Sequence, residues 1–147
     1  MIKNKALTGL LLALCITSNA CTGLGEGPFV IQIEESAAGL TDVAHSAASI
    51  LEEMAECHLF LFDGEPDIRI SSRAPRDPSW IAARTGNSIE IYTEDAIDEY
   101  VMAHELLHVL GFEHVDDPDN LMYEFKRTFG AHELNAEQLE MLKSFCR

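Results

Sequence analysis

The sequence is poor in basic residues and lacks a long hydrophobic run. Its 10 lysines and arginines stand against 25 aspartates and glutamates, and the formal net charge is −15. Such an acidic composition disfavours nucleic acid and anionic lipid surfaces as binding partners. The N-terminal apolar run spans only residues 6–16, whereas a membrane-spanning helix needs about 20 residues. Internal repeats and low-complexity tracts are also missing, so we expect an ordinary globular domain.

Cysteine is scarce as well, with four in the whole chain. Cys15 lies in the N-terminal apolar run and Cys21 just after it, which leaves Cys57 and Cys146 as a possible pair. In an exported protein this pair predicts a disulfide between the first long helix and the last one. Two unrelated buried thiols are the alternative.

The first 20 residues are typical of a secretion signal. Lys3 and Lys5 provide the positive start, residues 6–16 the apolar stretch, and residues 17–20 a cleavage region of small side chains. Cys21 follows directly, which resembles the lipobox of bacterial lipoproteins, where that cysteine is acylated. We therefore expect an exported protein that touches the membrane only through a lipid anchor at Cys21, at the bacterial cell envelope. Ordinary cleavage after residue 20 would instead give a soluble periplasmic or secreted protein.

The rest of the chain is expected to form a flexible tether at residues 21–27, which contain three glycines, and a single domain at 28–147. Apolar runs and alternating patterns indicate strands at 29–33, 67–71, 80–84 and 88–92. Helical spacing of apolar residues predicts a helix at 41–57. A second helix is expected to begin between Thr93 and Asp95. A third follows Asn135, an N-cap residue with Gln138 at the capping-box position.

The most informative segment is 104–114, which reads His-Glu-Leu-Leu-His-Val-Leu-Gly-Phe-Glu-His. His104 and His108 are four residues apart and share one face of a helix. Gly111 can adopt a left-handed conformation that ends the helix, so that the chain returns His114 as a third ligand. Three protein ligands leave one position of a tetrahedral zinc ion open, which is typical of a catalytic site. Three unrelated surface histidines on an acidic helix are the alternative.

This segment resembles the metzincin zinc metallopeptidases, whose signature His-Glu-x-x-His-x-x-Gly-x-x-His it matches at every fixed position. Residues 119–123, Asp-Asn-Leu-Met-Tyr, resemble the methionine turn of those enzymes, and with Asp117-Pro118 they are most similar to the matrixin subgroup. The resemblance implies a zincin-like α+β fold with a small twisted mixed sheet, two long helices and a C-terminal subdomain that holds a short helix. It also implies that Met122 forms an apolar floor under the metal without being a ligand.

The activity that the resemblance implies is zinc-dependent cleavage of internal peptide bonds. His104, His108 and His114 are expected to hold one catalytic Zn²⁺, and Glu105 to act as general base toward the metal-activated water. A non-catalytic, surface-displayed zinc-binding or adhesive lipoprotein is the alternative, although a purely structural site would not need Glu105. A secreted disulfide scaffold without metal would leave the histidine spacing unexplained.

The expected partner is a peptide or protein substrate. The strand predicted at 80–84 is then the sheet edge that faces the cleft, where an extended peptide could add by main-chain hydrogen bonds. An ordinary edge strand with Trp80 packed in the core is the alternative. The sequence leaves the oligomeric state and the cleavage preference open.

Overall fold

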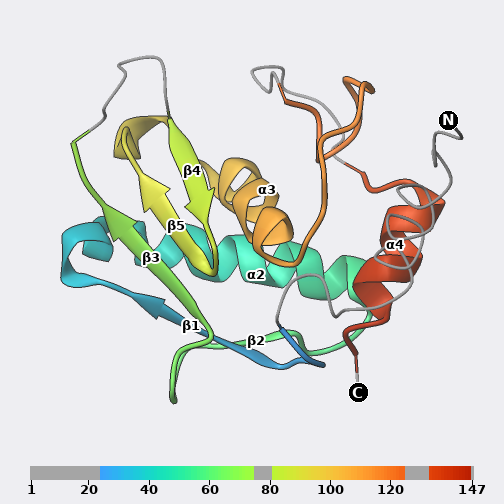
Figure 1. Ribbon diagram of the computed structural model, residues 1–147, viewed down its shortest axis with the longest axis horizontal. Coiled ribbons are helices and arrows are strands. Elements are labelled where there is room, and N and C mark those ends of the chain that lie inside the picture. Colours follow the sequence, from blue (N-terminus) through green and yellow to red (C-terminus); the bar gives the residue numbers. More distant parts are fainter. Residues whose placement is uncertain (1–23, 75–80, 125–132, 147) are drawn as a thin grey trace, which may run out of the picture.

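Five strands form one mixed sheet in the computed structural model, which describes residues 24–74, 81–124 and 133–146 (Figure 1). In chain order they are β1 (Phe29–Ile33), β2 (Phe60–Leu61), β3 (Ile68–Ser72), β4 (Ala82–Thr85) and β5 (Ser88–Ile91). Across the sheet they run in the order β2-β1-β3-β5-β4. The pairs from β2 to β5 are parallel, whereas β4 pairs antiparallel with β5 and forms one edge of the sheet.

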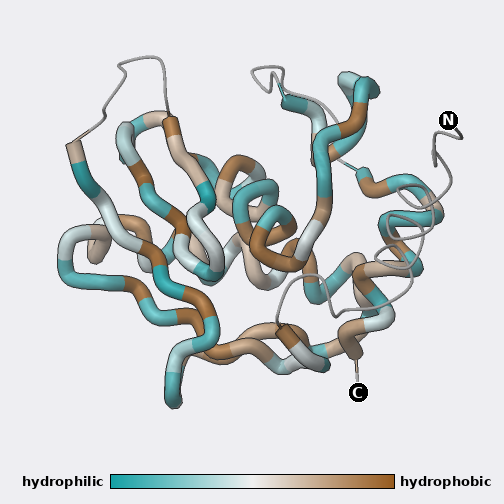
Figure 2. The backbone as a smooth tube through the Cα atoms, viewed as in Figure 1, coloured by the Kyte–Doolittle hydropathy of each residue, from teal (hydrophilic) through white to brown (hydrophobic). Residues whose placement is uncertain are grey.

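The strands form because β-branched residues alternate with polar ones. Ile68 and Ile70 of β3 are fully buried, while Arg69 between them is exposed. In β5 the buried positions are Ile89 and Ile91. This period of two places one side of each strand in the core. Figure 2 shows the apolar positions along the central strands and along α3.

In the described residues, three α-helices accompany the sheet: α2 (Thr41–Ala55), α3 (Glu99–Val109) and α4 (Ala136–Lys143). Two 3₁₀ turns, η2 (Glu35–Leu40) and η3 (Glu94–Ala96), precede α2 and α3. The buried face of α2 is made largely of small residues, which lets helices approach closely: Ala44, Ala47, Ala48, Leu51 and Ala55. Figure 1 shows α2 running behind the strands from the η2 end of the sheet toward α4.

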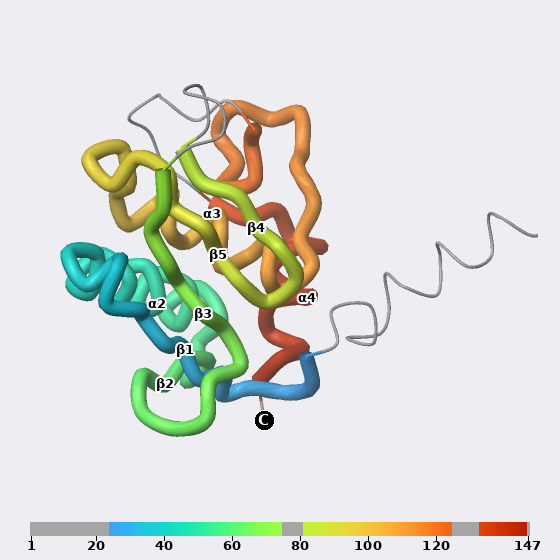
Figure 3. The backbone as a smooth tube through the Cα atoms, turned by 60° about the vertical axis from the view of Figure 1, so that its left-hand side comes forward, coloured from blue at the N-terminus to red at the C-terminus, as the bar shows by residue number. Residues whose placement is uncertain are grey.

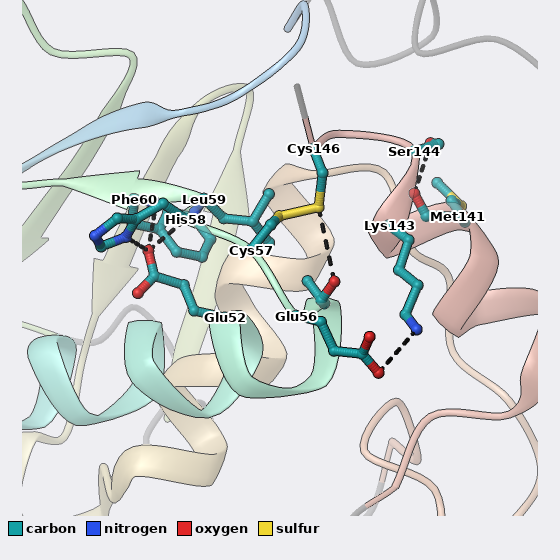
Figure 4. The surroundings of a disulfide bond; sticks show 11 residues. Glu52, Glu56, Cys57, His58, Leu59, Phe60, Met141, Lys143, Ser144 and Cys146 are labelled. Carbon is teal, nitrogen blue, oxygen red and sulfur yellow. Dashed lines mark hydrogen bonds and ion pairs between the residues drawn. A yellow bond between two sulfur atoms is a disulfide. The ribbon is translucent and has the colours of Figure 1, made fainter.

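The end of α2 is tied to the end of the chain. Glu56 adopts a left-handed conformation with φ of 60° and closes the helix through hydrogen bonds from its N–H to the carbonyls of Glu52 and Glu53. Cys57 then forms a disulfide with Cys146, 89 residues further along the chain (Figure 4). The Lys143 ammonium lies 3.2 Å from the Glu56 carboxylate beside this bridge. Together these contacts fasten α4 to α2.

The start of the described chain also meets its end. The Gly27 N–H donates a hydrogen bond of 2.8 Å to the carbonyl of Phe145. Figure 3 shows the two segments side by side below α4. Phe145 is fully buried, with its ring centroid 5.7 Å from that of Phe29 in β1. The C-terminal residues therefore belong to the same hydrophobic core as the sheet.

Glu52 fixes the passage from α2 to β2. Its carboxylate accepts hydrogen bonds of 2.9 Å from the N–H groups of Leu59 and Phe60 and lies 2.9 Å from Nδ1 of His58 (Figure 4). Burial acts to raise the pKa of Glu52, but these hydrogen bonds and the nearby imidazole hold it below its ordinary value. The ionised carboxylate thus orders the chain as it enters the sheet.

The expected α+β class, with a mixed sheet and a short C-terminal helix, is confirmed. Several boundaries were wrong. The helix predicted at 41–57 ends at Ala55, and the strand predicted at 80–84 is found at Ala82–Thr85. The second predicted helix, α3, begins at Glu99 and not between Thr93 and Asp95, because residues 94–96 form a separate 3₁₀ turn and Ile97 is extended.

Some expectations fall outside the described residues: the secretion signal at 1–20, the acylation of Cys21, and the packing of Trp80. Within the described ranges, every helix is too short or too polar to cross a membrane.

Candidate metal centre

The centre is built on α3, whose start is fixed by Asp98. The Asp98 carboxylate accepts hydrogen bonds from the N–H groups of Tyr100 at 3.0 Å and Val101 at 2.8 Å, as an N-cap residue does. Five apolar residues of the helix are buried and hold it in the core: Met102, Ala103, Leu106, Leu107 and Val109. His104 and His108 lie one turn apart on this anchored helix, so their rings project from a rigid support.

Gly111 makes the turn that brings back the third histidine. Its φ of 95° lies in the region that favours glycine. The Gly111 N–H bonds to the carbonyl of His108, and the Phe112 N–H to that of Leu107, both at 3.0 Å. These bonds close the helix and send the chain back past α3, so that His114 meets the two helical histidines. A side chain at position 111 would be strained in this conformation.

The three histidines each direct the Nε2 atom of the ring toward a common centre. Nε2 of His114 lies 3.2 Å from Nε2 of His104 and 2.9 Å from Nε2 of His108. Among the described residues, this trio is the one group of potential metal ligands whose donor atoms lie close together. The structure therefore brings together the three residues that the sequence singled out.

Backbone carbonyls set the direction of two of these rings. Nδ1 of His104 lies 2.8 Å from the carbonyl oxygen of Leu121, and Nδ1 of His108 lies 2.8 Å from that of Phe112. A carbonyl can only accept, so each Nδ1 carries the proton and donates it. The Nε2 atoms of both rings are then lone-pair donors that face the common centre, which is the arrangement that metal-binding histidines adopt.

This donor set fits a zinc ion. Three neutral imidazole nitrogens are typical zinc ligands, and at Zn–N distances of about 2.0–2.1 Å tetrahedral ligands lie about 3.3 Å apart. The observed spacings of 3.2 and 2.9 Å are close to that value. Lone pairs directed at one another at this range repel, and a cation between them removes the repulsion. The residues present thus fit the ion that the signature implies.

Burial changes the protonation of the groups around the centre. The pKa of His108 is lowered, first by burial, which keeps its ring neutral and able to bind a metal. Burial also raises the pKa of Glu105 to about 7. Glu105 follows His104 on α3, and a carboxyl group with such a pKa can both accept and return a proton near neutral pH.

Met122 is fully buried in the turn that follows the third histidine. Its carbonyl accepts a hydrogen bond of 3.0 Å from the N–H of Val115, so the turn and the His114 segment are held together. The neighbouring Leu121 supplies the carbonyl that orients His104. Met122 thus lies in the segment that the resemblance placed beneath the metal.

The other predicted site residues lie elsewhere. Cys57 and Cys146 form the disulfide at the junction of α2 and the C-terminus and take no part in the histidine cluster. An open pocket of about 450 Å³ adjoins the turn and is separate from the three clustered histidines. The described residues that line it are Asp117, Asp119, Asn120, Glu133, Leu134 and Asn135.

Sequence reasoning missed the groups that orient the ligands. The carbonyls of Phe112 and Leu121 have no residue-type signature, because every residue carries one. Arg84, whose guanidinium bonds to the backbone of α3, was also missed. The sequence placed Asn120 in the turn at 119–123 and Gln138 in a helix cap, but it gave no indication that their side chains bond to each other.

The comparison with protein families agrees with this geometry. The matrixin family model matches residues 42–143, which is more than half of the chain and includes the whole histidine segment. A comparison with curated proteins found no match.

Proposed function

The chain belongs to the matrixin family of metallopeptidases, and we propose on that premise that it is a zinc-dependent endopeptidase with Glu105 as its general base. The observation that carries the proposal is the convergence of three Nε2 atoms, two of them from the helix α3 that also carries Glu105. When bound, zinc lowers the pKa of water and polarises a carbonyl group, which is the chemistry that peptide hydrolysis needs.

Glu105 moves the proton in this reaction. Its carboxylate takes a proton from the attacking water and later gives it to the departing amine, so the group ends each cycle as it began. A pKa raised by burial suits both transfers better than that of an exposed glutamate would. The rings of His104 and His108 keep their orientation throughout, because each is hydrogen-bonded to a backbone carbonyl.

The β4 strand is the proposed binding place for the substrate backbone. Among the described strands it pairs only with β5, on one side, so its other side can accept an extended peptide. Arg84 of β4 donates a hydrogen bond to the carbonyl of His108, which fixes this edge next to α3. A peptide added along β4 would therefore run past the histidine cluster.

The alternative function is a zinc-binding or adhesive module that does not cut. It would keep the three histidines but has no use for the part-buried carboxyl group of Glu105 on the same helix. Three ligands in place of four also favour a reactive site over a structural one.

We also propose export and attachment to the cell envelope through a lipid at Cys21. The disulfide between Cys57 and Cys146 supports export, because such bonds persist in oxidising compartments.

A comparison of the wild type with Glu105→Gln tests the catalytic proposal. Glutamine keeps the size of the side chain and cannot act as a base, so zinc content should stay at one ion per chain while hydrolysis of an unfolded protein falls by at least about 10²-fold. Chelation should abolish the wild-type activity, and added zinc should restore it. A Glu105→Gln protein that cleaves at the wild-type rate would contradict the role of Glu105. A zinc-loaded wild type without any turnover would favour the non-catalytic module.

A further inference from the structure

Three polar side chains are buried in the described part of the chain: His104, Asn120 and Gln138, exposed by 8%, 3% and 9%. One of them is a predicted metal ligand on α3. The other two come from the turn at residues 119–123 and from α4. A buried polar group is costly unless it is hydrogen-bonded, and all three side chains have hydrogen-bond partners.

Asn120 and Gln138 bond directly to each other. The side-chain amide of Asn120 donates from Nδ2 to Oε1 of Gln138 at 2.8 Å. With its other end, Oδ1, Asn120 accepts a hydrogen bond of 2.8 Å from the N–H of Met122. One side chain therefore fixes its own turn and ties that turn to α4.

The residue between Asn120 and Met122 is Leu121, and its carbonyl accepts the proton on Nδ1 of His104 at 2.8 Å. The N–H of the same residue donates to the carbonyl of Glu133 at 2.9 Å. The direction of the Leu121 carbonyl is thus determined by bonds on both sides of it. A series of hydrogen bonds therefore links α4 to His104 through the Leu121 carbonyl.

Gln138 does more than cap its helix. In the capping box its Oε1 accepts from the N–H of Asn135 at 3.0 Å, and its own N–H donates to Oδ1 of Asn135 at 2.9 Å. The same Oε1 also accepts from Asn120. An oxygen has two lone pairs, and both are used here.

We propose that Asn120 and Gln138 are positioning residues for the metal centre. They hold the Leu121 carbonyl where it directs the His104 ring, so that Nε2 faces the other two nitrogens. The inference rests on the zinc site of the proposed function but does not require catalysis. Groups that orient a metal ligand typically change metal affinity by about 10- to 100-fold when they are removed.

The anchoring of α4 supports this role. The disulfide from Cys57 to Cys146 and the pair between Lys143 and Glu56 fasten the helix to α2. Gln138 therefore extends from an element that is held independently of the metal. A fixed support of this kind can orient a ligand before the ion arrives.

The test compares zinc affinity, measured by competition with a chromogenic chelator, in three purified variants of the full domain. Gln138→Leu removes both acceptor bonds and should weaken zinc binding by about 10- to 100-fold. Gln138→Glu keeps an oxygen for Asn120 and for Asn135 and should restore affinity to within about threefold of the wild type. Asn135→Ala removes the helix cap, leaves the bond to Asn120, and serves as the matched control. It should lower thermal stability with little change in affinity.

A fourth variant, at Asn120, covers the case in which Gln138→Leu does not fold. Asn120→Ser is too short to reach Gln138 but keeps an oxygen near the N–H of Met122, and it should also weaken zinc binding by about tenfold. Equal losses of affinity in Gln138→Leu and Asn135→Ala would overturn the inference, because the effect would then follow helix stability alone. So would wild-type affinity in Asn120→Ser. A wild type that binds no zinc would overturn the proposed function as well, whereas a wild type that binds zinc without cleaving peptides would overturn only the catalytic proposal.

Discussion

The guanidinium of Arg84 donates a hydrogen bond of 2.7 Å to the carbonyl oxygen of His108. One residue belongs to the edge strand β4, and the other is a predicted metal ligand near the end of α3. This bond fixes the distance between the proposed peptide-binding edge and the metal centre. A positive charge is also favourable at the carboxyl end of a helix.

Replacing Arg84 with alanine should therefore affect substrate binding more than metal binding. Loss of one exposed, charge-assisted hydrogen bond is worth about 1 kcal/mol. We expect KM for a peptide substrate to rise about three- to tenfold, with zinc affinity and kcat changed much less. Arg69→Ala is the matched control, since Arg69 is an exposed arginine on β3 of the same sheet. Equal kinetic effects in both variants would refute this role of Arg84.

The raised pKa of Glu105 predicts a pH-dependent stability of the metal-free protein. Burial raises this pKa from 4.5 to about 7, so the folded state binds the proton more tightly than the unfolded state does. The stability that protonation provides is complete below pH 4.5 and is lost as pH rises to about 7 and beyond. The difference between the two pKa values corresponds to at most roughly 3 kcal/mol.

In the metal-free state, Glu105→Gln should thus be more stable than the wild type at pH 8. The advantage should shrink to about half at pH 5.5, as urea unfolding at the two pH values would show. Saturating zinc should reduce the difference at pH 8, because a nearby cation favours the ionised carboxylate. An advantage that is the same at both pH values would show that ionisation is not its cause.

We expect the disulfide between Cys57 and Cys146 to contribute strongly to the free energy of unfolding. It closes a loop over a sequence separation of 89 residues, for which the chain-entropy estimate is about 4.6 kcal/mol. The double variant Cys57→Ser, Cys146→Ser should lose about that much free energy of unfolding. Wild type treated with a thiol reductant should behave like the double variant and serves as its control. A loss below about 1 kcal/mol would show that the reduced chain is held together by its core alone.

The proposed anchor at Cys21 predicts the location of the protein in a bacterial host. Cys21→Ser should release it from the membrane fraction into the soluble one and abolish incorporation of labelled palmitate. Intact membrane association in this variant would favour a different mode of attachment. Arg69→Ala serves as the control, since it changes an exposed residue outside the predicted signal and leaves the disulfide intact.

The histidine cluster was the part of the structure that the sequence predicted best, and the reason is local. The spacing of His104, His108 and Gly111 determines a helix face and a helix end, which are properties of a few consecutive residues. The capping box at Asn135 and Gln138 is local too, and the structure contains it.

Longer-range features could not be predicted in this way. The bond between Asn120 and Gln138 joins amides 18 residues apart, and no periodicity relates them. The start of α3 was misplaced because Asp95 and Asp98 are both plausible caps, and only the extended Ile97 between them decides in favour of Asp98. The carbonyls that orient the histidines depend on the folded path of the backbone.

The three histidines differ in their access to water, since His104 is buried and His114 is exposed. His104 and His108 belong to the packed helix α3, whereas His114 lies on an exposed segment after the helix. If the three rings hold a zinc ion, rotation of that one ring would open the coordination sphere while the rest of the domain keeps its shape. Exchange of such an ion with the surrounding medium would then proceed on the timescale of a side-chain movement, without waiting for the domain to unfold.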